Sequence, residues 1–295
     1  MFLVHVNGFF ALGQDRKDLK WKPLSVGSSN DKEVNWNHYL LTELIPVVYE
    51  NLFNFLKTLK VDGRILCTDG THYQAWPDQL VMDQKWVPIL EKFYRQMQSN
   101  KFVFVKYQNE WYHPKDVWFI RQNEMTAAEF KAVERFLECL RVPFATIPEA
   151  ITKPLTGKCK WMDKIKIAEF IRYNPNQYEK LGMEVQCNLL SYVVKTAEDL
   201  KLLINQRPLP LANGFGYFQL LHKNTNPKTT FYIPTEEIPA SLLPSTQRNV
   251  NEEFFKQNEE FRLRLRNIFS SKGLLSYFVF KEHLLRGFFS INKQF

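Results

Sequence analysis

The sequence lacks the features that usually identify a membrane protein or a disulfide-stabilised secreted domain. No apolar run approaches the ~20 residues of a membrane helix, and the N-terminus has neither the basic region nor the small-residue cleavage site of a signal peptide. Cysteine is scarce and forms no CxxC pair; the four residues are Cys67, Cys139, Cys159 and Cys187. We therefore expect reduced thiols, a cytoplasmic location and no membrane partner.

Motifs for metal, nucleotide or covalent chemistry are also missing. No histidine lies three or four residues from another histidine or a cysteine, so we expect no metal site. The sequence has no P-loop and no G-x-S-x-G elbow. Asp69 lies close to His72, but such a pair is common in loops, and 213–216 holds a lone G-x-G that we interpret as a turn entering a strand. We expect no enzyme activity and no cofactor in this chain alone.

What the chain does have is enough apolar material for a large core. Of its 295 residues 45% are hydrophobic, and 25 are phenylalanine, which argues against disorder. The formal net charge of +8 allows an acidic partner or nucleic acid without requiring either. The aromatic excess suggests that one apolar face is covered by a neighbour.

The apolar spacing predicts an α+β fold of mixed helices and short strands, with a helix-rich C-terminal half. One helix is expected to begin at residue 126. Others are expected at 36–58, 82–98, 162–173, 184–195, 197–204, 251–269 and 274–288. Strands are expected at 2–12, 102–107, 117–120, 214–221 and 229–234. We expect either two domains, 1–125 and 126–295, or one continuous body.

The first long helix is expected to pack on the core through one stripe and to kink at Pro46, because proline removes a helix hydrogen bond. The expected stripe is Leu40, Leu44, Val47, Val48, Leu52, Phe55 and Leu59. A capping box at Thr126 and Glu129 opens the next helix, on whose apolar face we expect Cys139 to be buried. Near the end of the chain, Glu260 is spaced to pair with Arg264 on a helix with an apolar stripe. That stripe is Phe254, Phe261, Leu265 and Ile268.

A basic stretch gives an alternative function. Its lysines are Lys153, Lys158, Lys160, Lys164 and Lys166. Trp161 lies in their middle, and lysine with an aromatic ring suits phosphate contact and base stacking. A nucleic-acid-binding module is therefore the rival hypothesis, although a lysine-rich helix entry is more often a solvated face, so we do not expect nucleic acid as the partner.

The N-terminal block is the most distinctive part of the sequence. Its strand runs into a turn that carries Arg16 and Lys17, and the Trp36-Asn37 pair opens the next helix. Two cationic side chains on a turn after a strand are well placed to contact a phosphate group that another domain holds. The strand also begins at the first residue, so we expect further chain upstream.

This block resembles the sacsin-like family of very large co-chaperones. The resemblance rests on 4–12, 15–19 and 36–41, with weaker matches at 147–150, 189–193 and 207–218 in the same order, and it thins after about residue 235. In that family the block follows a GHKL-type ATP-binding lobe. The acidic-asparagine helix and Asp-x-Gly-x-Gly loop of such a lobe are absent from this sequence.

The resemblance implies a non-catalytic scaffold segment that assists protein folding and quality control beside an ATPase lobe located elsewhere. It implies the heat-shock chaperone machinery and that lobe as partners, and ATP as a cofactor of the full-length parent. By analogy, Arg16 would contact the terminal phosphate, with Lys17 as second candidate. The family turn usually has two arginines, and lysine at position 17 keeps the charge but loses the bidentate fork.

Overall fold

The computed structural model describes residues 9–14, 19–21, 31–61, 64–65, 73, 87–148, 151, 159–203, 206, 208–210, 217–218, 250–256 and 258–271. The chain divides into two compact units, one of residues 1–121 and 142–161 (unit 1), the other of residues 122–141 and 162–295 (unit 2). Both contain helices, and the strands form separate small sheets, so the predicted α+β class is confirmed. The division at residue 125 stays a prediction.

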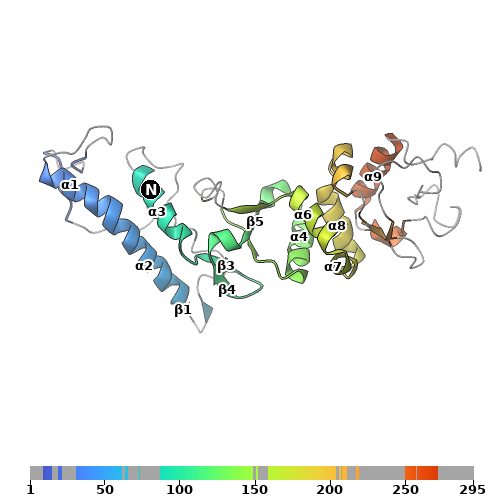
Figure 1. The fold of residues 1–295 in the computed structure, drawn as a ribbon, viewed down its shortest axis with the longest axis horizontal. Helices are drawn as coiled ribbons and strands as arrows, with labels where there is room; N and C mark the ends of the chain where they lie inside the picture. The colour runs from blue at the N-terminus through green and yellow to red at the C-terminus, as the bar shows by residue number, and fades with distance from the viewer. Residues whose placement is uncertain are drawn as a thin grey trace, which may run out of the picture. The chain divides into compact units, whose positions relative to one another are not determined.

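A long helical rod opens unit 1 (Figure 1). It consists of α1 (Lys32–Tyr39), a π turn (Leu40–Leu44) and α2 (Ile45–Thr58). The rod starts before the predicted residue 36 because Asp31 caps it: its Oδ1 accepts from the Glu33 N–H at 2.9 Å.

The π turn explains how the rod accommodates Pro46. Proline lacks an N–H and clashes with the carbonyl four residues back in a regular α-helix. Here the Ile45 N–H donates to the Leu40 carbonyl, five residues back, and Pro46 occupies the first turn of α2. The ribbon therefore continues through the proline without a break (Figure 1).

The rod packs on the core of unit 1 through aromatic side chains. Tyr49 and Phe53 of α2 are buried beside α3 (Val87–Gln98). The Phe93 ring lies 5.3 Å from the Tyr49 ring in an edge-to-face arrangement, and 5.3 Å from the Tyr94 ring. Such contacts add to the stabilisation that the buried area itself gives.

The predicted core stripe of the rod was wrong. Leu40 is buried, but four of the other residues are exposed by 41% to 59%: Leu44, Val47, Val48 and Phe55. The core-facing residues are instead Leu41, Ile45, Tyr49 and Phe53. The helix is apolar on two faces, and spacing alone does not say which of them meets the core.

The strands that the structure describes in unit 1 are short and form three small sheets. β1 (Lys60–Val61) pairs with β2 (Arg64–Ile65). The expected strands at 102–107 and 117–120 are present as β3 (Val103–Val105) and β5 (Trp118–Ile120), but they do not pair with each other.

The partners of these two strands were not predicted. β3 forms an antiparallel hairpin with β4 (Glu110–Tyr112), whose turn places Asn109 at φ 56°, a conformation that asparagine tolerates. β5 lies between β6 (Phe144–Ala145), with which it is parallel, and β7 (Lys160–Met162). Strands of two or three residues carry too little alternation to be recognised from the sequence.

Unit 2 is mainly helical among its described residues. Its α-helices are α4 (Ala127–Cys139), α6 (Lys164–Tyr173), α7 (Pro175–Glu179), α8 (Met183–Val193) and α9 (Glu259–Ser271). Short 3-10 segments span Gln122–Glu124, Ala197–Leu203 and Glu252–Phe254. The expected helix at 197–204 is thus a 3-10 segment, and α7 was not predicted.

The other strands that the structure describes lie in unit 2. β8 (Leu209–Pro210) pairs antiparallel with β9 (Tyr217–Phe218), which lies within the strand predicted at 214–221. The strand expected at 229–234 and the helix expected at 274–288 lie outside the described residues.

Packing in unit 2 centres on α4 and α8. Phe136 of α4 meets Tyr178 edge-to-face at 6.3 Å. All four residues of the stripe predicted near the end of the chain are buried: Phe254, Phe261, Leu265 and Ile268. Only the last three lie on α9, because this helix begins at Glu259 and not at the predicted residue 251, and Phe254 belongs to the preceding 3-10 segment. Cys139 was wrongly expected to be buried. It is exposed, because it is the last residue of α4 and lies at the margin of the helix face that holds Ala132, Val133 and Phe136.

Candidate functional site

The base of the N-terminal hairpin is the part of the distinctive block that the structure describes. An antiparallel bridge joins Leu12 to Leu19, and the Lys20 N–H donates to the Ala11 carbonyl at 2.9 Å. Arg16 and Lys17, the predicted phosphate contacts, lie between these two arms and outside the described residues.

Asn37 fixes both arms of this hairpin to the rod. Its Oδ1 accepts from the Ala11 N–H at 2.8 Å, and its Nδ2 donates to the Ala11 carbonyl at 2.7 Å and to the Lys20 carbonyl at 3.0 Å. The carboxamide therefore takes the place of a neighbouring peptide unit. Asn37 is 0% exposed, so losing it would leave buried backbone groups without these partners.

Four exposed apolar residues surround the hairpin base, and we call them the hairpin platform: Phe9, Leu12, Trp36 and Tyr39. The Trp36 Nε1–H donates to the Phe9 carbonyl at 2.8 Å, which holds the indole beside the strand. The Trp36 and Tyr39 rings stack with their centroids 6.1 Å apart. Phe9 is 95% exposed, which is unusual for so large an apolar side chain.

The basic stretch is less available to a ligand than the sequence suggested. Lys164 Nζ lies 2.6 Å from Asp199 Oδ1, and Lys166 Nζ lies 2.6 Å from Glu169 Oε2. These two lysines belong to unit 2, whereas Lys160 belongs to unit 1. Lys153 and Lys158 lie outside the described residues.

The tryptophan of the basic stretch is a packing residue of unit 1. The Trp161 ring lies 5.6 Å from the Phe119 ring, and the Arg121 guanidinium lies 4.8 Å from its centroid. Lys160 lies 5.9 Å from the Trp118 ring in a similar way. A partly buried indole covered by a guanidinium does not present an open face for a base to stack on.

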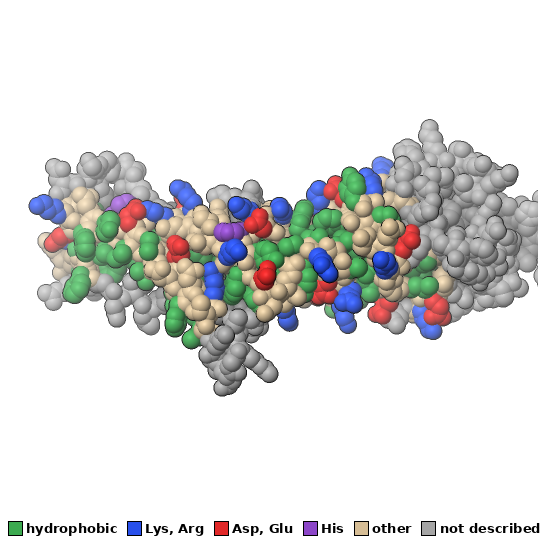
Figure 2. All heavy atoms as spheres, turned by 60° about the horizontal axis from the view of Figure 1, so that its bottom comes forward, with side chains coloured by type: hydrophobic (Ala, Val, Ile, Leu, Met, Phe, Trp, Pro, Cys, Tyr) green, Lys and Arg blue, Asp and Glu red, His purple; other side chains and the backbone are tan. Residues whose placement is uncertain are grey.

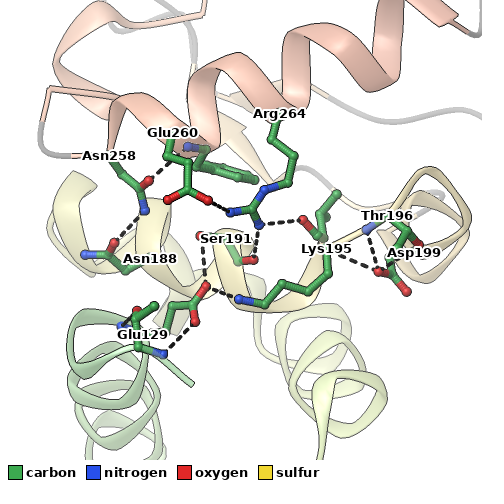
Figure 3. A network of polar contacts seen from close by, with 12 residues as sticks. Glu129, Asn188, Ser191, Lys195, Thr196, Asp199, Asn258, Glu260 and Arg264 are labelled. Atoms are coloured by element: carbon green, nitrogen blue, oxygen red, sulfur yellow. Dashed lines mark hydrogen bonds and ion pairs between the residues drawn. The ribbon is translucent and has the colours of Figure 1, made fainter. Parts of the chain in front are cut away.

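Unit 2 contains a buried polar network that the sequence did not predict (Figure 3). At its centre, Glu129 Oε1 accepts from the Ser191 hydroxyl at 2.9 Å and pairs with Lys195. Glu129 Oε2 accepts from the Thr126 N–H at 3.0 Å, and Thr126 Oγ1 accepts from the Glu129 N–H at 3.2 Å, which confirms the capping box.

The same network reaches α9. The Arg264 guanidinium donates to the carbonyls of Ser191 at 3.2 Å and Val194 at 3.3 Å, and it pairs with Glu260 at 3.0 Å as the sequence predicted. Asn258, whose Oδ1 accepts from the Phe261 N–H at 3.0 Å, donates to Asn188 Oδ1 at 2.9 Å. These side chains attach α9 to α8 (Figure 3).

This network has the chemistry of a structural clamp. Ser191 is 2% exposed, and its hydroxyl donates to a carboxylate that already holds a lysine. Nearby, a cavity of about 250 Å³ is lined by Cys187 and Phe254, among others, and burial raises the pKa of the Cys187 thiol to about 12. At neutral pH that thiol is protonated and therefore a poor nucleophile or metal ligand.

Several other predicted features remain untested. Asp69, His72 and the G-x-G at 213–216 lie outside the described residues. Within the described part of the chain, no group of three or more His, Cys, Asp or Glu side chains is placed to hold a metal ion. No helix in that part is long and apolar enough to cross a membrane.

Comparison with known proteins confirms the resemblance to sacsin. The chain is 25% identical to sacsin of Homo sapiens over 251 residues, or 83% of this chain. It is therefore a sacsin-like segment that spans 5% of the length of that relative. No family model matches the chain, and no solved structure matches it.

Proposed function

We propose that this chain is a non-catalytic scaffold segment of a sacsin-like co-chaperone, and that its hairpin platform docks against an ATP-binding lobe. The observation that carries the proposal is the exposed group Phe9, Leu12, Trp36 and Tyr39 around a hairpin base that Asn37 fixes in place. Protein interface cores are enriched in aromatic residues, and here such residues are exposed around a base that hydrogen bonds hold in place. The similarity to sacsin supports the same proposal.

On this proposal the turn between the two arms reaches the nucleotide of the docked lobe. Arg16 contacts the terminal phosphate through its guanidinium, and Lys17 adds a weaker point charge. On this proposal the docked lobe, and not this chain, holds the ATP. The chain's further partners would be the heat-shock chaperone machinery of the cytoplasm.

The experiment joins this chain to a cognate ATP-binding lobe and measures nucleotide affinity and turnover. Arg16→Ala should reduce one or both, and Lys17→Ala should have the smaller effect. Trp36→Ala should weaken docking of the separate lobe, whereas Tyr173→Ala, which changes an exposed aromatic residue of unit 2, should not. If Arg16→Ala changes neither affinity nor turnover, the phosphate contact is wrong; if the lobe does not bind at all, the scaffold proposal itself fails.

The rival function, nucleic-acid binding through the Lys153 to Lys166 stretch, has less support. Lys164 and Lys166 already pair with carboxylates, and the pKa of Lys166 is raised by its hydrogen bond to Glu169. A titration with labelled RNA at several salt concentrations separates the two functions. Binding that falls steeply with salt would favour the rival, and the absence of binding at low salt would remove it.

A further inference from the structure

The cavity beside α8 has an apolar lining and a buried amide nitrogen. Its volume is about 250 Å³, and residues of α8 and of the segment 253–258, all in unit 2, line it. Met183, Cys187 and Phe254 supply the apolar part of the lining. Cys187 and Phe254 are 2% and 1% exposed, so much of this lining is shielded from bulk water.

Asn188 supplies the amide nitrogen. Its side chain is 6% exposed, and its Oδ1 accepts from Asn258 Nδ2 at 2.9 Å. Figure 3 shows the amide nitrogen of Asn188 directed away from Asn258, and among the described residues no group accepts a hydrogen bond from it. The oxygen of the second amide is also in use, since Asn258 Oδ1 accepts from the Phe261 N–H at 3.0 Å. The two amides therefore offer a ligand a donor, and an acceptor placed in the cavity would satisfy it.

The volume and the lining indicate a ring-sized apolar group. An apolar cavity of about 150 Å³ in another protein holds benzene, so this cavity has room for a ring and several further atoms. Met183 and Cys187 contribute two sulfur atoms, which make favourable contacts with the edges of aromatic rings. Phe254 contributes an aromatic side chain, for which a second ring is also a favourable neighbour.

The charges of the lining favour an uncharged ligand. Burial raises the pKa of the Cys187 thiol to about 12, so this group is neutral at pH 7. Glu184, Glu253 and Lys256 also line the cavity, and Glu253 pairs with Lys256 at 3.2 Å. An anion would lose its hydration beside apolar groups and meet two carboxylates for one ammonium, whereas a cation would oppose the N–H donor of Asn188.

We propose that this cavity binds a small uncharged molecule that combines an aromatic ring with a carbonyl oxygen. The ring packs against Met183, Cys187 and Phe254, and the carbonyl accepts from Asn188 Nδ2. Benzamide is the simplest probe with this chemistry. We expect it to bind with a Kd on the order of 1 mM, as is usual for so small a ligand.

The first test titrates the whole chain with benzamide and follows binding by ligand-observed NMR. Asn188→Asp keeps an oxygen that accepts from Asn258 Nδ2 but replaces the donor nitrogen with a second oxygen, so the Kd should rise at least about 10-fold. Asn176→Asp is the matched control: it places the same charge on an exposed residue of unit 2 and should leave the Kd unchanged. Circular dichroism of each variant verifies the fold.

The second test locates the probe in the cavity. Cys187→Leu fills part of the space and should weaken benzamide at least about 10-fold, whereas Cys139→Leu, at an exposed cysteine of unit 2, should not. In the unmodified chain, benzamide at ten times its Kd should slow the alkylation of Cys187 by iodoacetamide about 10-fold. Alkylation of Cys139 should keep its rate, and peptide mass spectrometry measures both.

The third test compares probes of nearly the same shape. Benzoate should bind at least about 10-fold more weakly than benzamide because it is an anion, and toluene should bind more weakly because it has no acceptor. Figure 2 shows Lys or Arg as well as Asp or Glu side chains on the surface of unit 2, so a charged probe also has weak sites outside the cavity. The part of benzoate binding that Cys187→Leu removes is therefore the quantity to compare.

Four results would overturn the proposal. One is the absence of benzamide binding at ten times the expected Kd. Binding that neither Asn188→Asp nor Cys187→Leu weakens would place the probe elsewhere on the chain, as would an unchanged alkylation rate of Cys187. Benzoate binding in the cavity as tightly as benzamide would refute the uncharged ligand class. Because these measurements need no ATP-binding lobe, their outcome is independent of the proposed function.

Discussion

The two units hold their folds in different ways. The described core of unit 1 is made mainly of aromatic and aliphatic side chains, among them Tyr49, Phe53, Phe93 and Tyr94. Unit 2 buries several polar side chains within its apolar packing, among them the carboxylates Glu129 and Asp199, whereas the buried polar side chains described in unit 1, Asn37 and Thr42, are uncharged. Apolar packing tolerates changes of pH, whereas a buried polar group depends on each of its partners. We therefore expect the stability of unit 2 to depend more strongly than that of unit 1 on pH and on single polar contacts.

The sequence provides a convenient way to observe the units separately. All seven tryptophans lie within residues 1–121 and 142–161, which belong to unit 1. Tryptophan fluorescence therefore follows the unfolding of unit 1, and far-UV circular dichroism follows both units. A change that alters the second signal while leaving the first in place acts on unit 2.

The largest effect should come from Phe93→Ala in unit 1. Phe93 is 1% exposed and meets the rings of Tyr49, Phe53 and Tyr94, so its removal leaves a cavity. We expect the free energy of unfolding to fall by about 3–5 kcal/mol in the tryptophan-detected transition. A loss below about 1 kcal/mol would mean that these rings do not form the core of unit 1.

Glu129→Gln should have the next largest effect, and it should act on unit 2. The change removes the charge that Lys195 pairs with and weakens the bond from Ser191. We expect a loss of about 2–3 kcal/mol, seen by circular dichroism with little change in tryptophan fluorescence. Glu138→Gln is the control on the same helix, because Glu138 pairs with Arg135 at the surface and should cost less than about 0.5 kcal/mol.

Asn37→Ala should destabilise the hairpin base, with a smaller loss of free energy than the two changes above. The variant removes three hydrogen bonds to the backbone of Ala11 and Lys20. We expect the free energy of local opening to fall by about 1–3 kcal/mol, measured by hydrogen exchange of the Ala11 and Lys20 amides. Asn35→Ala, on the exposed side of α1, should leave that exchange nearly unchanged.

Lowering the pH should have the smallest effect on stability, and this effect should again be larger in unit 2 than in unit 1. Burial raises the pKa of Glu129, but hydrogen bonds from Lys195, the Thr126 N–H and Ser191 outweigh it and leave the pKa below its usual value. For Asp199, burial is likewise outweighed by hydrogen bonds from Lys164, the Thr196 N–H and the Thr196 hydroxyl, which leave its pKa below the usual value. A lowered folded pKa gives stability above the ordinary carboxyl value of about 4, and that stability is lost as the pH falls through the folded value.

The measurement is denaturant unfolding at pH 7 and at several values below about 4. The circular dichroism transition of unit 2 should weaken more than the tryptophan transition of unit 1. Glu129→Gln should reduce the difference, since it removes one of the two carboxylates. Equal weakening of both transitions would contradict the assignment of the pH-sensitive network to unit 2.

The sequence correctly predicted those features that depend on residues close together in the chain. The capping box at Thr126 and Glu129 and the pair of Glu260 with Arg264 were correct because each depends on residues three or four positions apart. Three residues of the predicted stripe lie on α9 and are buried, Phe261, Leu265 and Ile268, and their spacing of four and three also depends only on residues close together in the chain. The resemblance to sacsin was likewise carried by residues close together in the first forty positions.

The sequence did not predict what depends on distant partners. Glu129 was identified as a cap, but its contacts with Ser191 and Lys195 join residues 62 and 66 positions away. Asn37 gave no signal for its bonds to Ala11 and Lys20, because an asparagine near a helix start is usually read as a cap. Leu44, Val47, Val48 and Phe55 were wrongly predicted to face the core, because the rod has two apolar faces and only the tertiary structure selects between them.

The π turn has a consequence for the rotational phase of the rod. The residues that face unit 1 recur at strict intervals of four: Asn37, Leu41, Ile45, Tyr49 and Phe53. On a regular helix each such step advances the side chain by about 40° around the axis, so the row would spiral away from its neighbours. The extra residue in Leu40–Leu44 turns the row back, which lets one end of the rod hold the hairpin while the other end meets α3.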